Sequence, residues 1–493
     1  MNYLNNTDLS TVKVLNKSEF PSKSKAKDKV INSVEELIKG LDLKDNAVVS
    51  FHHHLRNGDS VLNTIMKEIQ SKGIKGITLV ASSLFPVHAE IIPLLKDGTI
   101  ENIVTSYISG DLAKAISYGE LKGKIIMQTH GGRARSILDE DIVIDVAFIA
   151  SPSSDKFGNI SGVNGHNSCG TLGYAIADSI KAKTVISVTD ALVEYPNYPA
   201  DITEDYVDQV LVIDSIGRKE GIVSGTTRVT KDPIGLKIAK DTLKVMEATG
   251  LLKDGLSFQS GAGGISLAVT DYLRDYMIEN NIKGSFASGG ITGYLTGMLE
   301  EGLFSSLFDV QCFDLEAIES LKRNPNHIRM SGSQYGNPRV SSVVDNLDIV
   351  ILGATEIDVD FNVNVTSGAD GVLMGGSGGH ADTAAGSKVS IIVSKLFSSR
   401  IPLIKDRVDV ITTPGTTVDV LVTERGICVN PLRTDLIESF KKANLNIIDI
   451  KDLKEYAENI MGKAKPIEKT GRIIGLSEYR DGSIIDYIYE VKK

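Results

Sequence analysis

Short, strongly apolar segments recur along the first half of this chain and sharply limit its possible folds. Amphipathic segments such as Val61–Lys72 and Gly173–Lys181 lie between them. Apolar strands that alternate with helices are typical of a parallel sheet covered on both faces. The sequence therefore predicts an α/β fold with mostly parallel sheets. The expected strands of this half are Ala47–Phe51, Ile77–Ala81, Ile125–Gln128, Val143–Ala150 and Thr184–Val188.

The same alternation begins again after Asp232-Pro233. A helix is expected at Ile234–Thr249 and a strand at Leu256–Gln259, followed by a glycine turn and a second helix. In that second helix an apolar residue stands at every fourth position from Ile265 to Met277, which predicts one buried stripe. Further strands are expected at Gly284–Ser288, Ile349–Leu352, Val389–Val393, Val408–Thr412 and Val418–Thr423.

The length of the chain, 493 residues, exceeds what one hydrophobic core usually supports. Because both halves begin with the same strand–turn–helix plan, we expect two related α/β domains in tandem, at 29–230 and 231–493. Residues 1–28 are polar and lysine-rich without an apolar stretch. They are expected to form a flexible N-terminal arm and not a secretory signal.

Charge and cysteine content argue against several functional classes. The net charge of −10 disfavours general binding to nucleic acid or to a membrane surface. The sequence contains no run of about 18 apolar residues for a membrane span. The three cysteines are far apart and form no Cys-x-x-Cys pair, which indicates reduced thiols and neither a disulfide framework nor a zinc site. We therefore expect a soluble cytoplasmic protein that requires no metal.

Three glycine-rich loops fall in the second half of the chain. The first, Ser260–Gly264, joins a predicted strand to a predicted helix, where glycines let the backbone approach a ligand and helix N–H groups point at it. It also fits the first half of a dinucleotide-binding fingerprint, but the next strand ends at Ser288 without the acidic residue that binds a ribose hydroxyl. A plain tight turn is the other alternative.

The other two loops are Gly289–Gly293 and Gly375–Gly379. The first follows the strand Gly284–Ser288, at the end where parallel sheets bind ligands. The second has four glycines in five positions, which neither a strand nor a stable helix tolerates. A flexible surface linker is the alternative for this loop. Together the three loops predict a single crevice that holds a ligand against exposed backbone.

The order and spacing of these motifs resemble the C-terminal half of CoA-transferases. The matching segments are Ser260–Gly264, Gly284–Gly290, Ala354–Asp358, Gly376–His380 and Val422–Gly426. Within that superfamily the chain is most similar to the citrate lyase α subunit, which it also resembles at Phe51–Asp59 and Asp190–Pro196. The resemblance runs from about residue 30 to the C-terminus. It implies two tandem CoA-transferase-like (NagB/RpiA-like) domains.

The resemblance also implies a reaction and its partners. Citrate and an acetyl-thioester carrier would give a citryl-thioester carrier and acetate. The thioester would belong to CoA, or to a phosphoribosyl-dephospho-CoA arm on a separate acyl carrier protein, the γ subunit. A β subunit would then cleave the citryl thioester. The chain would thus act in an oligomeric citrate lyase complex.

One departure from the superfamily bears on the mechanism. Covalent CoA-transferases carry a glutamate nucleophile at the position that matches Gly290 here. The resemblance therefore implies direct attack by a citrate carboxylate in a ternary complex, through a mixed anhydride. In that case backbone N–H groups are the expected catalytic donors, and the candidates are Gly263, Gly264, Gly289 and Gly290. A covalent transferase that uses Glu356 and a non-catalytic, ligand-sensing scaffold remain alternatives.

Further residues are expected to bind the arm and the substrate. Gly261, Gly376, Gly378, Gly379 and His380 are the candidates for the CoA-like arm. Citrate needs guanidinium groups, which bind carboxylates bidentately. His52, His54, Arg56 and Arg133 are the candidates for citrate, with Arg135, Arg329 and Arg339 as further possibilities. Consecutive strand residues point to opposite faces, so His52, His53 and His54 cannot all converge on one metal.

Overall fold

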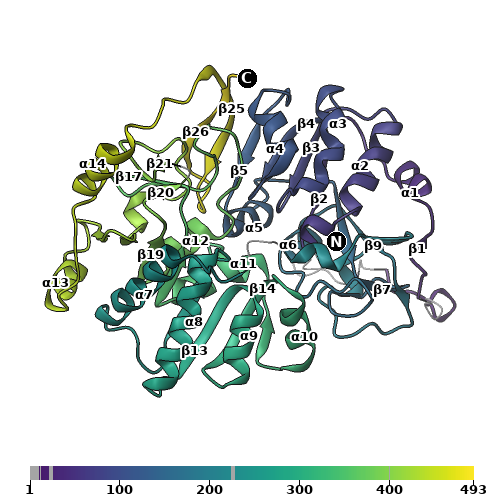
Figure 1. Cartoon of the computed structure of the whole chain (residues 1–493). Helices are drawn as coiled ribbons and strands as arrows, with labels where there is room; N and C mark the ends of the chain where they lie inside the picture. The colour runs from purple at the N-terminus through teal and green to yellow at the C-terminus, as the bar shows by residue number, and fades with distance from the viewer. Residues whose placement is uncertain (1–9, 11–12, 21–25, 224–227, 399) are drawn as a thin grey trace.

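A computed structural model of the chain describes residues 10, 13–20, 26–223, 228–398 and 400–493. Most of the expected arm at 1–28 lies outside these residues. Two α/β halves lie side by side, the first purple to blue and the second teal to green in Figure 1. Each half contains one large, mostly parallel sheet, as the sequence predicts. In the described part of the chain, no helix has the length and apolarity that crossing a bilayer requires.

The first sheet contains ten strands in the order β1-β11-β9-β6-β2-β3-β4-β5-β25-β26. Its strands are β1 Val30–Ile31, β2 Val48–Phe51, β3 Ile77–Ala81, β4 Ile100–Thr105, β5 Ile125–Met127, β6 Val146–Ser151, β9 Thr184–Thr189, β11 Gln209–Val212, β25 Lys469–Glu478 and β26 Ile484–Val491. The helices of this half are α1 Val34–Gly40, α2 Val61–Ser71, α3 Ile92–Lys96, α4 Gly110–Ser117, α5 His130–Leu138 and α6 Ala175–Lys181.

The second sheet contains eight strands in the order β15-β14-β13-β12-β16-β19-β23-β24. Its strands are β12 Ser257–Ser260, β13 Gly284–Ile291, β14 Phe304–Cys312, β15 His327–Arg329, β16 Ile349–Leu352, β19 Val389–Val393, β23 Val420–Val422 and β24 Ile427–Val429. The helices are α7 Pro233–Ala248, α8 Gly264–Glu279, α9 Gly293–Glu300, α10 Leu315–Arg323, α11 Gly332–Gly336, α12 His380–Gly386, α13 Thr434–Lys442 and α14 Ile450–Met461. The predicted stripe of α8 is buried at Val269, Leu273 and Met277.

The two halves repeat one topology. When the second sheet is read from β23 to β15, its strands follow the same chain order as those of the first sheet from β11 to β5. Each half also has a small three-stranded sheet, β10-β7-β8 in the first and β18-β17-β22 in the second. These strands are β7 Ser153–Asp155, β8 Ile160–Ser161, β10 Leu192–Val193, β17 Glu356–Asp358, β18 Val363–Asn364 and β22 Ile404–Lys405. The expectation of two related α/β domains is therefore correct.

Local hydrogen bonds repeat as well. Asp155 accepts from the backbone N–H of Asn159 and from its Nδ2 (2.8 Å), and these bonds close the turn after β7. Asp358 accepts from the backbone N–H of Asn362 (2.9 Å) and from its Nδ2 (3.1 Å) in the matching turn. Asp358 thus stabilises a turn, which explains part of the acidic strand pattern at 356–360.

The end of the chain departs from the expected domain division at 230/231. Strand β25 pairs in parallel with β5 of the first sheet, and β26 pairs with β25. In Figure 1 this yellow hairpin lies beside the blue strands of the first half. Residues Lys469–Val491 therefore extend the first sheet, although they follow the second domain in sequence. Pairing with β25 covers the edge that β5 would otherwise expose, and β26 becomes the edge strand on that side.

One expected strand, Val408–Thr412, is absent. Val408 and Val410 are buried, so their apolar character reflects packing and not a place in a sheet. The segment runs as a loop across the Asp358 turn, where the Val408 N–H lies 3.4 Å from an Asp358 carboxylate oxygen. A short apolar run does not by itself distinguish a strand from a buried loop.

Two reciprocal hydrogen bonds join the halves at the helix N-termini. His130, at the start of α5, donates its N–H to the Gly378 carbonyl (2.8 Å) in the second half. Gly332, at the start of α11, donates its N–H to the Gly173 carbonyl (2.8 Å) in the first half. The carboxyl ends of strands from both sheets therefore meet at one junction, where parallel sheets bind ligands.

Candidate functional site

A cavity of about 340 Å³ lies at this junction and collects all three glycine-rich loops. The first half contributes loops that follow β2, β3, β4 and β5. The second half contributes the loop after β12, Gly290 near the end of β13, the end of β14 with Phe313, and the loop before α12. The lining residues are His53, Arg56, Ser83, Phe85, Tyr107, His130, Tyr174, Gln259, Ser260, Gly261, Ala262, Gly263, Gly290, Gln311, Phe313, Tyr335, Gly376, Ser377, Gly378 and Gly379. We call this space the junction cavity.

Arg56 is the cation of the junction cavity. Its guanidinium carbon lies 4.6 Å from the centre of the Phe313 ring and 5.3 Å from that of Phe85. In the described part of the chain it has no ion-pair partner, and its buried Nε has no hydrogen-bond acceptor. Burial lowers the pKa of this guanidinium from its usual value. An unpaired, partly buried cation between two aromatic rings is suited to an anionic ligand.

The backbone of Arg56 is also unusual. Its φ of +52° lies in the left-handed region, which a non-glycine residue rarely adopts. The conformation places the side chain into the cavity from the short helical turn Arg56–Gly58 that follows β2. Backbone strain of this kind gathers at ligand-binding sites, where the surrounding structure maintains it.

The first glycine loop places the N-terminus of α8 beside the junction cavity. Gly261 donates its N–H to the Ile351 carbonyl (2.8 Å), so this amide is already engaged. Gly263 is the N-cap and Gly264 the first residue of α8, a helix of 16 residues. N–H groups at these positions have no partner within the helix. They and the helix dipole together favour a developing negative charge.

The second glycine-rich segment, expected as a loop at 289–293, begins inside β13, which extends to Ile291 and not only to Ser288. The register with β14 shifts between Gly289 and Gly290, and Gly289 has a φ of +107°. A methyl group on Gly290 would lie 2.2 Å from the Phe313 ring. That ring therefore fills the space in which a side chain at position 290 would stand, and it stacks against Arg56. The absence of a side chain at Gly290 is a packing requirement of this cavity.

The third loop crosses between the halves. A methyl group on Gly376 would lie 2.3 Å from the Ser106 carbonyl oxygen, and one on Gly379 would lie 2.0 Å from the Tyr335 hydroxyl. Gly378 has a φ of +50° and accepts the hydrogen bond of the His130 N–H. The glycines of this loop therefore allow close packing across the junction, and the loop is not a surface linker.

The histidines that follow β2 divide between two environments. The Nδ1 atoms of His52 and His54 contact each other behind the cavity, and neither residue lines it. His53 does line it, with Nδ1 2.6 Å from the Ser82 hydroxyl and its ring stacked on Tyr174. Burial, with a further contribution from His130, lowers the pKa of His53 well below its usual value. His53 is therefore neutral at pH 7 and can donate or accept one hydrogen bond in the cavity.

Two other expected site residues lie outside the cavity lining. Arg133 is buried and binds Asp178 through two hydrogen bonds, of 2.9 and 2.7 Å. His380 has its Nδ1 2.7 Å from the Thr413 hydroxyl and its Nε2 2.9 Å from the Gly353 carbonyl. Burial lowers the pKa of His380 to about 4. Both side chains therefore already have hydrogen-bond partners within the chain.

A groove of about 800 Å³ adjoins the junction cavity at Gly263. Gly264 and apolar side chains that include Ile265, Met374 and Phe397 line it, and we call it the arm groove. Beyond it lies a pocket of about 410 Å³ with Lys405, Lys463, Lys465 and Lys469, which we call the lysine pocket. The arm groove and the lysine pocket share Glu356, Ala369 and Pro402. The three spaces are therefore contiguous.

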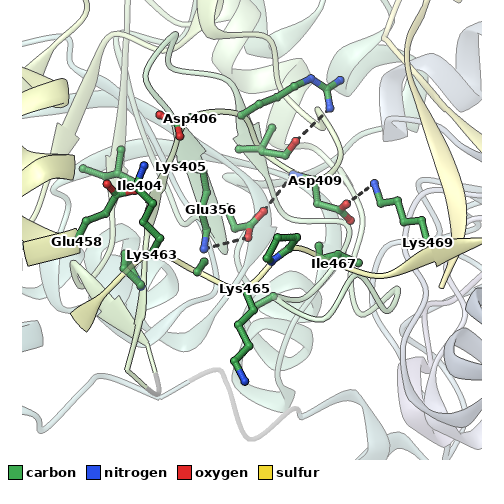
Figure 2. Close-up of a pocket in the computed structure, with 16 residues that line it drawn as sticks. Glu356, Ile404, Lys405, Asp406, Asp409, Glu458, Lys463, Lys465, Ile467 and Lys469 are labelled. Carbon is green, nitrogen blue, oxygen red and sulfur yellow. Dashed lines mark hydrogen bonds and ion pairs between the residues drawn. The ribbon is translucent and has the colours of Figure 1, made fainter. Parts of the chain in front are cut away.

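Glu356 lies at this shared boundary and does not line the junction cavity. Its carboxylate accepts from Asn364 Nδ2 (3.1 Å) and from the Asp409 N–H (3.2 Å), and it lies 3.7 Å from Lys405 Nζ. Figure 2 shows the contacts of Glu356 with Lys405 and Asp409, with Asp409 in turn paired to Lys469. The carboxylate is thus held within a network of ion pairs and hydrogen bonds.

The junction cavity contains no protein carboxylate and no thiol among the described residues. Its chemistry is that of a cation, neutral imidazoles, hydroxyl groups, amide groups and exposed backbone. Such a site can bind carboxylates, exclude water and stabilise an oxyanion. It lacks the side chain that would usually attack a thioester.

Comparison with known proteins decides the family. The family model described as "Citrate lyase, alpha subunit (CitF)" matches residues 27–491. The citrate lyase α chain of Haemophilus influenzae is 44% identical over 486 residues, which are 98% of this chain and 97% of that protein. The chain belongs to the citrate lyase α-subunit family.

Further relatives agree with this assignment. The citrate lyase α chain of Escherichia coli is 45% identical over 471 residues, 95% of this chain and 92% of the relative. A crystal structure from Streptococcus mutans, described as an α subunit of citrate lyase in complex with citrate, is 46% identical with a TM-score of 0.93 and covers 96% of this chain and 93% of that one. The chain is therefore a component of an enzyme, citrate lyase.

A more distant structure supports the fold alone. The α subunit of a malonate decarboxylase from Acinetobacter baumannii is 14% identical, with a TM-score of 0.65 over 89% of this chain and 94% of that one. The predicted fold of two tandem CoA-transferase-like domains agrees with these neighbours and with the repeated topology.

Several residues that line the junction cavity could not be predicted from the sequence. His53 was considered only as one of three adjacent histidines, and Phe313, Tyr174, Tyr335 and Gln311 gave no signal of their own. His52, His53 and His54 lie beyond the end of β2, where strand alternation no longer fixes the directions of successive side chains, so the sequence could not single out His53. The aromatic residues could not have been found either, since their role depends on packing between the halves.

Proposed function

We propose that this chain transfers a thioester carrier from acetate to citrate in a ternary complex, through a mixed anhydride. The observation that carries the proposal is the composition of the junction cavity. It combines the unpaired cation Arg56 with exposed glycine backbone and has no protein carboxylate or thiol among the described residues. The attacking carboxylate must then come from citrate, which is ionised at pH 7 and needs no general base.

The steps balance without a protein nucleophile. A citrate carboxylate oxygen attacks the acetyl carbonyl carbon, the C–S bond breaks, and the carrier leaves as a thiolate. The thiolate then attacks the citryl carbonyl of the anhydride, and the bond to the acetate oxygen breaks. The products are the citryl thioester and acetate. Both steps pass through an oxyanion, for which the N–H groups of Gly263, Gly264, Gly289 and Gly290 are the proposed donors.

The energetic contributions come from position and from these donors. One donor to an oxyanion contributes about 3–4 kcal/mol in sites of this kind. Holding citrate and the thioester together contributes up to about 7–11 kcal/mol. Arg56 would orient citrate through one carboxylate, and His53 through a single neutral hydrogen bond. His52, His54 and Arg133 would support this surface from behind and not contact citrate.

The arm groove and the lysine pocket support binding of a CoA-type arm. Apolar residues line the groove next to Gly263, and the lysines lie at its far end. In this arrangement the thioester would reach the junction cavity past Gly261 and Gly263, and Gly376, Gly378 and Gly379 would form the opposite wall. The phosphates of the arm would lie near Lys463 and Lys465, which have no ion-pair partners among the described residues. His380 would hold the backbone of that wall.

The same proposal includes the partners of the chain. An acyl carrier protein (γ) subunit would deliver the arm, and a β subunit would cleave the citryl thioester to oxaloacetate and acetyl thioester. These subunits would form an oligomeric complex with this chain. Cys169, Cys312 and Cys428 are buried and unpaired, as is usual in a reducing compartment such as the cytoplasm.

A transferase assay tests the proposal directly. The purified chain is given acetyl-CoA with citrate or with citramalate, and citryl-CoA, citramalyl-CoA and released acetate are measured. We expect acyl exchange with citrate. If neither acid accepts the carrier, the substrate assignment is wrong.

The covalent alternative is tested by trapping. Acetyl-CoA is added without citrate, followed by hydroxylamine or borohydride, and the peptides are analysed by mass spectrometry. The ternary mechanism predicts no modified Glu356 peptide and no loss of activity. A modified Glu356 peptide would show that the network around this carboxylate releases it for catalysis and would overturn the proposal.

Lys463→Gln should raise KM for acetyl-CoA at unchanged kcat, whereas Lys454→Gln, whose lysine pairs with Asp406, is the matched control.

A further inference from the structure

A cluster of metal-binding side chains lies behind the junction cavity, in the second sheet. Asp309 and Cys312 are on β14, and His327 is on the neighbouring strand β15. Their ligand atoms all lie within 4.8 Å of one another, and all three side chains are buried. The Asp309 carboxylate oxygen Oδ2 lies 3.0 Å from Cys312 Sγ and 3.4 Å from His327 Nε2. In a tetrahedral zinc site, bond lengths of about 2.0–2.3 Å imply ligand separations of about 3.3–3.8 Å. The Asp309–His327 separation lies within this range, and the Asp309–Cys312 separation lies slightly below it.

Two atoms of this cluster are buried without partners. Asp309 Oδ1 and His327 Nε2 have no hydrogen-bond partner among the residues that the structure describes. The cation on the neighbouring strand, Arg329, forms an ion pair with Asp201 instead (Nε–Oδ1 3.2 Å). The Asp309 carboxylate therefore receives neutral donors on one oxygen and nothing on the other. A buried charge in this situation is costly unless a cation compensates it.

The surroundings orient the candidate ligands. His327 Nδ1 lies 3.1 Å from the Ser320 hydroxyl, which leaves Nε2 directed at Asp309. Metal-binding histidines usually have such a partner on the other ring nitrogen. The Thr171 hydroxyl donates to Asp309 Oδ2 (2.9 Å) from the other half of the chain. A methyl group on Gly170 would lie 2.3 Å from Cys312 Sγ, so Gly170 is needed for this approach.

We propose that Asp309, Cys312 and His327 bind a divalent metal of the zinc class. One thiolate, one imidazole and one carboxylate suit Zn²⁺, whereas Mg²⁺ and Ca²⁺ prefer oxygen ligands alone. Asp309 Oδ1 or the Thr171 hydroxyl supplies the fourth donor. On binding, the Cys312 thiol loses its proton to solvent and its sulfur forms the bond to the metal. The reaction needs no oxidant or other co-reactant.

The metal stabilises β14 beside the junction cavity and does not take part in acyl transfer. β14 continues from Asp309 through Gln311 to its end at Cys312, and Phe313 follows directly; Gln311 and Phe313 both line the junction cavity. Gln311 Nε2 donates to the His53 carbonyl (3.2 Å) in the first half. A metal on Asp309 and Cys312 thus stabilises the strand that positions these two residues, and it lies next to Thr171 of the first half.

The test uses tag-free full-length chain purified without chelator. Metal content is measured by plasma mass spectrometry, and the position of the metal by anomalous diffraction at the zinc edge. We expect about one zinc per chain, located at the cluster. Replacement with Co²⁺ should produce a thiolate-to-cobalt charge-transfer band. Less than about a tenth of an equivalent of zinc, together with no such band after Co²⁺ addition, overturns the proposal, as does zinc bound elsewhere.

Variants separate the cluster from other cysteines. Cys312→Ser and His327→Gln should lose the zinc and the cobalt band, whereas Cys428→Ser, which replaces a buried cysteine of another cluster, should keep both. Added zinc should raise the melting temperature of chelator-treated wild type and Cys428→Ser but not of Cys312→Ser. Full zinc content in Cys312→Ser contradicts the proposal. If that variant does not fold, the wild-type cobalt spectrum and anomalous map decide.

Discussion

Arg56 provides the sharpest test of the proposal that the junction cavity binds citrate. Its guanidinium is partly buried between the Phe85 and Phe313 rings and has no ion-pair partner among the described residues. Replacing it by glutamine removes a charge-assisted, bidentate contact to a carboxylate while leaving a polar side chain of similar reach. Loss of one partner from such a pair costs about 2–5 kcal/mol. Because Arg56 is only partly buried, we expect Arg56→Gln to weaken transition-state binding by about 2–4 kcal/mol.

That range corresponds to a fall of roughly 30- to 700-fold in kcat/KM for citrate, at about 1.4 kcal/mol per factor of ten. Arg56→Lys keeps the charge but not the planar pair of donors, and it should retain more activity than Arg56→Gln. Steady-state transferase kinetics with varied citrate, at fixed acetyl-CoA, measure both variants. The KM for acetyl-CoA should change much less than that for citrate.

Stability separates a binding role from a structural one. An unpaired buried cation costs folding free energy, so Arg56→Gln should unfold at the same temperature as wild type or at a higher one. Citrate at about 100 times its Kd should stabilise the wild type by about 2.7 kcal/mol and the variant far less. If Arg56→Gln keeps kcat/KM within about twofold and still responds to citrate in thermal unfolding, Arg56 does not bind citrate and the reasoning is wrong.

Other contacts predict further outcomes. Gly290→Ala should lower kcat/KM by about tenfold or more, because its methyl group would lie 2.2 Å from the Phe313 ring; steady-state kinetics check this, and full activity would contradict the packing argument. Asp178→Asn should lower the free energy of unfolding in urea by about 3–5 kcal/mol, since it leaves the buried Arg133 without its carboxylate; an unchanged midpoint would refute this. Burial raises the pKa of Asp382 from 3.8 to about 6, so the folded state binds more protons than the unfolded state between these values and stability falls as pH rises through them. Asp382→Asn should flatten that decline in urea titrations from about pH 4 to 6, and parallel curves would show that another group causes it.

Much of the architecture could be predicted from the sequence because its causes are local. The apolar runs before the glycine loops become β12 and β13, and the four-residue spacing from Ile265 to Met277 becomes the buried stripe of α8. Those signals depend on neighbouring residues and on backbone period, which the sequence displays directly. The run at Val408–Thr412 shows the limit of such predictions. Its apolar residues are buried in a loop, and they give the same sequence pattern as a buried strand.

The candidate site was predicted in part. The glycine loops at 260–264, 289–293 and 375–379 do meet at one cavity, and Arg56 enters it. The sequence favoured Arg56 among the arginines because it follows the end of a strand, but it could not exclude Arg133, which pairs with Asp178 only in the folded structure. Nor could the cysteine spacing reveal the Asp309, Cys312 and His327 cluster, which forms only when β14 and β15 lie side by side.

By itself, the sequence determined the α/β class, the repeated plan, the positions of the flexible turns and the resemblance to citrate lyase α subunits. Only the tertiary structure decided which charges remain unpaired, which of the three consecutive histidines lines the junction cavity, and that the last hairpin extends the first sheet. The physical reason is the range of each interaction. Periodicity and turn chemistry act over a few residues, whereas pairing, burial and desolvation are settled by groups brought together from distant parts of the chain.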